Sequence, residues 1–160
     1  IALMWVEFSS PETAIIIGGF ILAARRVSEM IIAPLAGRIS DYFGAALPLL
    51  SMLFLCGIGF LLVGLGSLIL GSIALVICRG ALGTLFPTAA SKIYPGDAMS
   101  AFTRNQTWRD IGAAAGPLAT GVLLGLISAE FIHILVFGFF IITSIWFFLS
   151  GDCKKLGLPE

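Results

Sequence analysis

Six charged side chains interrupt long apolar segments of this 160-residue chain, and their chemistry is the most direct indication of a function. A charge that faces lipid at the centre of a bilayer costs at least about 2.5–3.5 kcal/mol. Such residues therefore face a bundle interior or a water-filled cavity, and they mark substrate or ion pathways. We interpret the set as candidates for a cavity or for ion coupling: Arg25, Arg26, Glu29, Arg79, Arg109 and Asp110.

The spacing of these charges predicts which of them pair. Arg25 and Glu29 are four residues apart, so they share one face of a helix and can form an ion pair. The alternative for this pair, and for Arg109 with Asp110, is a structural ion pair that only locks helices together. Arg79 has no acidic neighbour on its own segment and needs a partner elsewhere.

Composition and hydropathy place these charges in an integral membrane protein. Hydrophobic residues make up 59% of the chain and charged residues 11%, against roughly a quarter charged in soluble domains. Helices are expected, because a lipid-exposed backbone must satisfy its own hydrogen bonds. We predict an all-α membrane bundle over residues 1–150 and a cytoplasmic tail over 151–160. Its spans are one incomplete segment, 1–8, and five complete ones, 12–36, 45–66, 67–91, 99–126 and 131–150.

The distribution of basic residues predicts the orientation. Basic residues gather at one set of alternate loops, whereas the opposite ends carry Glu7, Glu12 and Glu130. The positive-inside rule then favours a cytoplasmic C-terminus in a multi-pass protein of a plasma or inner membrane. Because 1–8 resembles the end of a helix, we expect the chain to be a fragment of a longer protein. The basic residues are Arg38, Lys92, Arg104, Lys154 and Lys155.

Residues 37–44 are predicted to form a short charged turn between two long apolar spans. Glycine stands at both ends, at Gly37 and Gly44, with Arg38 and Asp41 between them. A turn this short joins two antiparallel helices closely and puts fixed charges at one membrane face.

Small residues predict where helices approach one another. Gly112, Gly116 and Gly121 are spaced by four and five residues, and small residues let two backbones come close. Pro117 frees a backbone carbonyl and permits a bend. Ordinary helix packing is the alternative interpretation of these positions.

No residue pattern supports an enzyme, a metal site or a cofactor site. The three cysteines are dispersed, and no Ser-His-Asp set or glycine-rich phosphate loop occurs. The net charge of zero and the lack of a basic stripe give no case for nucleic acid as a partner.

Three motifs in fixed order resemble the major facilitator superfamily of transporters. Gly37-x-x-x-Asp41-x-x-Gly44 resembles the loop signature of that family. Arg79-Gly80-x-x-Gly83 is similar to its fourth- or tenth-helix pattern, and Gly112-x-x-x-Gly116-Pro117-x-x-x-Gly121 to its antiporter-type pattern. The joint match is more specific than any one motif.

The departures from the family pattern indicate which half of a transporter this chain resembles. The family signature places basic residues where this chain has Tyr42, Ala45 and Ala46. That weaker form is typical of the second half, so we interpret the chain as the end of helix seven through helix twelve. The N-terminal half is the alternative.

The resemblance implies one six-helix half of a twelve-helix bundle that moves an unknown small molecule by alternating access. The missing half of the same transporter is then the partner, together with the lipid bilayer. Gly37, Arg38, Asp41 and Gly44 would form a cytoplasmic gate turn. Arg79 would lie near the cavity, and the Gly116–Pro117 segment would bend during rocking.

The sequence leaves open which ion drives transport and which functional class the protein belongs to. Glu29 and Asp110 suggest a proton-coupled exporter, although neighbouring arginines hold such carboxylates ionised. The alternative class is a non-transporting assembly or sensor subunit on a transporter-like scaffold. A permease domain of an ATP-driven pump would need a cytoplasmic coupling helix, and no loop here is long enough for one.

Overall fold

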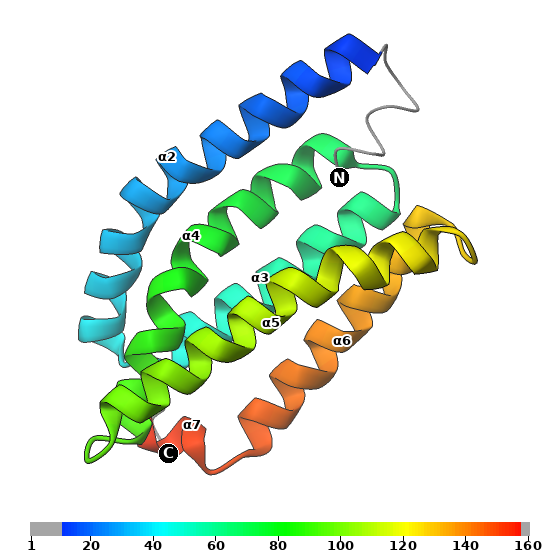
Figure 1. The fold of residues 1–160 in the computed structure, drawn as a ribbon. Helices are drawn as coiled ribbons and strands as arrows, with labels where there is room; N and C mark the ends of the chain where they lie inside the picture. The colour runs from blue at the N-terminus through cyan, green and yellow to red at the C-terminus, as the bar shows by residue number, and fades with distance from the viewer. Residues whose placement is uncertain (1–10, 158–160) are drawn as a thin grey trace.

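The computed structural model describes residues 11–157, and this part of the chain is helical almost throughout (Figure 1). Five long helices run up and down, and one short helix follows them. The expectation of an all-α protein is confirmed for these residues, whereas the predicted partial span 1–8 lies outside them. The helices are α2 (Pro11–Phe43), α3 (Ala46–Gly64), α4 (Leu68–Ile93), α5 (Ala98–Leu124), α6 (Ala129–Leu149) and α7 (Asp152–Lys155).

Three helices of the described part are long and apolar enough to cross a membrane. They are α3, α4 and α6, with mean hydropathy values of 2.4, 2.0 and 2.3. The other two long helices, α2 and α5, carry charged residues near their middles. These three apolar helices are consistent with a membrane protein.

The first loop is shorter than the sequence predicts. Residues 37–43 belong to α2, and only Gly44 and Ala45 separate α2 from α3, so the predicted turn over 37–44 is wrong in extent. A glycine inside a helix costs about 1 kcal/mol, but Ala36 and Ser40 on either side of Gly37 are buried. The packing of those neighbours carries the helix on to Gly44. There a φ of +81° ends α2 in the left-handed region that glycine tolerates.

Helix α4 lies at the centre of the described bundle. It packs against α2 on one side and against α3 on the other, and α3 in turn packs against α6 (Figure 1). Buried side chains from these interfaces form the main core, including Leu49 and Leu53 of α3 and Cys78 and Leu85 of α4. Helix α5 contributes only Ala101 to the buried residues.

Glycine lets α3 and α4 approach closely. A Cβ at Gly71 would lie 2.5 Å from Cγ2 of Val63 and 2.8 Å from the carbonyl oxygen of Gly59. A Cβ at Gly59 would lie 3.0 Å from Cγ of Leu75. Neither position has room for a side chain, so these glycines set the distance between the two helices.

The end of the chain folds back onto the first loop. The carbonyl oxygen of Leu156 accepts hydrogen bonds from the backbone N–H groups of Ala45 and Ala46, at 3.0 and 3.4 Å. These groups begin α3 and otherwise lack intrahelical partners, so the Leu156 carbonyl group caps that helix. Leu156 is 2% exposed. The predicted tail over 151–160 therefore contains a helical turn that packs against the bundle.

Cys153 of α7 is also buried. Its Sγ donates to the carbonyl oxygen of Phe147 at 3.2 Å. Burial, and secondly the Asp152 carboxylate, raise the pKa of the Cys153 thiol. A hydrogen bond from Nζ of Lys155 to the same carboxylate, at 2.9 Å, raises the pKa of Lys155. The raised pKa of Cys153 disfavours the thiolate, which is the nucleophilic form of cysteine.

We expect Gly44→Ala to destabilise the protein more than the matched variant Gly66→Ala. Both glycines have positive φ, +81° and +84°, so both alanines incur strain of about 1–3 kcal/mol. Only at Gly44 would the new Cβ also meet a neighbour, the Leu156 carbonyl oxygen at 2.8 Å, whereas Gly66 has open space. Thermal unfolding of the purified protein in detergent measures the difference. Equal losses would show that the C-terminal segment does not dock on this loop.

Candidate functional site

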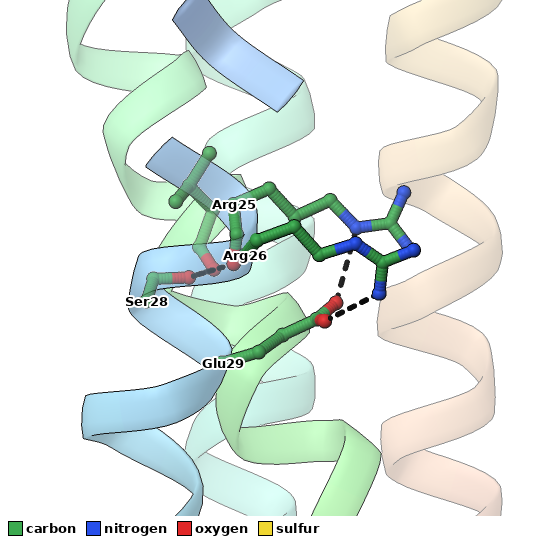
Figure 2. Close-up of polar contacts among 5 residues, drawn as sticks. Arg25, Arg26, Ser28 and Glu29 are labelled. Carbon is green, nitrogen blue, oxygen red and sulfur yellow. Dashed lines mark hydrogen bonds and ion pairs between the residues drawn. The ribbon is translucent and has the colours of Figure 1, made fainter. Parts of the chain in front are cut away.

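Arg25, Arg26 and Glu29 form a triad on one side of α2. Nε of Arg25 donates to Oε1 of Glu29 at 3.1 Å, and Nη1 of Arg26 donates to Oε2 at 3.0 Å (Figure 2). The predicted pairing of Arg25 with Glu29 is confirmed, and Arg26 joins it. Both carboxylate oxygens of Glu29 are therefore occupied by guanidinium donors.

Ser28 links this triad to α4. Its hydroxyl lies 3.0 Å from the carbonyl oxygen of Val76 and 2.9 Å from that of Arg25, within its own helix. Close packing continues beside it, because a Cβ at Gly80 would lie 3.1 Å from the carbonyl oxygen of Ser28 and 3.3 Å from Cβ of Ile32. The charged part of α2 is therefore held level with the middle of α4.

Arg79 stands next to the contact made by Gly80. Its side chain is exposed, and within the described residues it makes no ion pair. Its electrostatic neighbours are Arg25, Glu29 and Arg26 of α2 and Arg109 of α5. The partner that the sequence requires for Arg79 is thus not supplied by residues 11–157.

Arg109 and Asp110 form an ion pair within α5. Nε and Nη2 of Arg109 lie 3.3 and 3.2 Å from Oδ1 of Asp110. Their side chains are 54% and 69% exposed. Since both residues belong to one helix, the pair does not lock α5 to a neighbour, and the same holds for the triad on α2. The only hydrogen bond between helices at this level, among the described side chains, comes from Ser28.

The six predicted charges lie in the middles of three helices. Each lies eleven or more residues from both ends of its helix, or about 16 Å at 1.5 Å per residue. The contact of Ser28 with Val76 holds the charged part of α2 level with the middle of α4, and Arg79 interacts electrostatically with charges of α2 and α5. Four guanidinium groups face two carboxylates, which leaves a net charge of +2.

The predicted gate residues lie at the end of α2. Gly37 faces α4, with its Cβ position 3.9 Å from Cγ2 of Thr84. Arg38 and Asp41 are exposed, and neither has a side-chain partner in the described part of the chain. The structure thus places Asp41 on the last turns of a helix. Its role in a gate stays a prediction.

The predicted packing glycines divide into two groups. Gly80 makes a close helix contact. The others have nothing within 4 Å of a Cβ among the described residues, and α5 continues as a helix through Pro117. A packing role for this second group stays a prediction. It consists of Gly83, Gly112, Gly116 and Gly121.

Ser28 and Leu156 are the contributors that the sequence interpretation missed. The signal for Ser28 was a small polar residue beside Glu29 in the middle of a predicted span, where serine often bonds across helices. Leu156 acts through its backbone carbonyl, so its residue type carries no signal. Residues 11–157 contain no group of three or more His, Cys, Asp or Glu side chains that could hold a metal ion.

No protein-family model matches this chain, and neither a curated protein nor a solved structure matches it.

We expect Gly80→Leu to separate α2 from α4, with Gly83→Leu as the control on the same helix. The leucine at position 80 would enter space held by the backbone of Ser28, whereas position 83 is exposed and open. Overpacking of this kind costs about 1–3 kcal/mol. Thermal unfolding in detergent should show a clear loss for the first variant and little change for the second. Similar stability of the two variants would contradict the close contact.

Proposed function

We propose that this chain is one half of a secondary transporter that moves a small molecule across a membrane by alternating access. The observation that carries the proposal is the set of charges in the middles of α2, α4 and α5, with Arg79 unpaired within the described residues. In a membrane these positions fall near the midplane, where half of the hydrocarbon core is about 15 Å thick. Transporters bind substrate at that depth, between two halves.

The order of motifs along the chain supports the same class. Gly37 and Asp41 lie in the last turns of α2, and Gly44 follows that helix directly. Arg79-Gly80 lies in the middle of α4, and Gly116-Pro117 lies within α5. This placement agrees with the resemblance to the major facilitator superfamily, of which this chain would supply the end of helix seven through helix twelve.

The exposed surface of α5 is the place we assign to the other half. Residues 107–123 of this helix are all exposed, including Trp108 at 72% and Leu118 at 74%. Small residues over the same stretch would allow a second helix to approach closely. The proposal therefore puts the central cavity between this surface, the charges of α2 and α4, and six further helices of the same polypeptide.

The competing class is a non-transporting assembly or sensor subunit. In such a protein the deep charges would serve to lock helices, and each would be paired across a helix interface. The observed ion pairs lie within single helices instead. A charged residue without a partner, such as Arg79, favours a water-accessible cavity.

Proton coupling stays a prediction, and the contacts of both carboxylates count against it. Glu29 accepts hydrogen bonds from two arginines and Asp110 from one. Nearby positive charge favours the ionised form of a carboxyl group and so disfavours its protonation. We therefore propose neither residue as the proton carrier.

We expect Arg79→Ala to lower transport at least about tenfold in the polypeptide that contains both halves. The variant would lose the proposed hydrogen bond from the guanidinium group to the substrate, and a charged hydrogen bond is worth about 1.5–3 kcal/mol. Asp41→Asn should lower transport as well if Asp41 belongs to the gate. Lys92→Ala is the control, since Lys92 lies exposed in the last turn of the same helix as Arg79. Counterflow of radiolabelled compounds into proteoliposomes, at matched expression, measures the rates. Undiminished transport in both variants would remove the assigned roles.

A cysteine at position 79 should react with a charged, membrane-impermeant methanethiosulfonate reagent, whereas one at position 81 should not. Position 79 is exposed toward the proposed cavity, and Ala81 is 1% exposed. Both variants are made after replacing Cys56, Cys78 and Cys153, and labelling is read by mass spectrometry. Protection of both positions in the full-length protein would favour the non-transporting class.

A further inference from the structure

The region around Arg79 carries more positive charge than its own carboxylates can neutralise. Glu29 is held by Arg25 and Arg26, and Asp110 is held by Arg109, so each carboxylate is already engaged. The side chain of Arg79 is left with none, within the described residues. Its electrostatic neighbours among the described residues are three further guanidinium groups, which repel it, and one carboxylate.

An arrangement of this kind needs a counter-anion. An uncompensated charge away from bulk water is costly, and the cost falls when an opposite charge with matched hydrogen bonds is present. Among the described residues, the two carboxylates of this cluster, Glu29 and Asp110, are already paired with arginines of their own helices. A bound anion would neutralise part or all of the excess of +2.

The available donors also have a defined chemistry. A guanidinium group presents five N–H donors in a planar fork, which matches the paired oxygens of a carboxylate or phosphate. Arg25 and Arg26 each use one nitrogen on Glu29, and Arg79 donates to no described acceptor. The guanidinium groups of Arg25 and Arg26 thus keep unused N–H donors. The Ser28–Val76 hydrogen bond and the close contact at Gly80 hold this part of α2 level with the part of α4 that carries Arg79.

We infer that this site binds a small organic or inorganic oxyanion, a carboxylate or a phosphate, between Arg79 of α4 and the arginine pair of α2. The inference rests on the proposed function, because it names the class of substrate for the same cavity. The triad on α2 has the role of a positioning group, in which Glu29 orients Arg25 and Arg26. Neutral and cationic compounds lack the charge that the site requires.

The test uses the full-length protein and pairs of probes that differ in charge. Thermal shifts in detergent are recorded with succinate and succinamide, with benzoate and benzamide, and with glycerol 3-phosphate and glycerol, while inorganic phosphate and tetraethylammonium are added singly. We expect at least one oxyanion to raise the unfolding temperature and its uncharged counterpart to leave it unchanged. Carboxylates and phosphates form separate arms, so the result also selects between them.

Variants then place the effect at Arg79. Arg79→Gln should weaken binding of that oxyanion about 10–100-fold, as expected for the loss of a charged hydrogen bond. Arg79→Lys keeps the charge without the fork and should recover part of the affinity. Lys92→Gln, at the far end of the same helix, should bind like the unchanged protein. Gel filtration confirms that each variant is folded.

The outcomes separate this inference from the proposed function. Stabilisation by uncharged or cationic probes alone, by none of the probes, or by an oxyanion equally in Arg79→Gln, would overturn the anion site. Transport of a neutral or cationic compound into proteoliposomes would then still support a transporter. Binding of an oxyanion that depends on Arg79, without transport of any probe, would uphold the anion site and overturn the transporter.

Discussion

The close approach of α4 to α2 and to α3 is the constraint on which the rest of the described structure depends. Gly71 admits Val63 and the backbone of α3, and Gly80 admits the backbone of α2. Packing density, not a hydrophobic gradient, holds helices together when their surroundings are apolar, so contacts of this type set the geometry. The register of α2 against α4, and with it the level of the charged side chains, follows from these contacts.

That register has an electrostatic consequence. Arg79 interacts electrostatically with the arginines of α2, and no described carboxylate forms an ion pair with it. Each acidic side chain of the cluster is engaged by a residue one to four positions away on the same helix. The ion pairs therefore lie within single helices, and the cluster as a whole keeps a net charge of +2.

The N-terminus of α3 depends on a contact with a residue that is distant in sequence. The N–H groups of Ala45 and Ala46 receive their acceptor from Leu156, more than one hundred residues later. Gly44 makes this possible because it has no Cβ to meet that carbonyl group. The conformation of the loop between α2 and α3 therefore depends on the contact with Leu156.

The amino-acid sequence by itself determined the helical class, the limits of α3 to α6 to within a few residues, and the pairing of Arg25 with Glu29. These features are local, because apolar length and the spacing of four residues act within one helix. The tertiary structure decided the extension of α2 to Phe43, the Ser28 bond to Val76, the level of Arg79 and the docking of Leu156. Each of these depends on the register between helices and on backbone groups. Periodicity within one helix does not encode that register, and a backbone carbonyl is the same for every residue type.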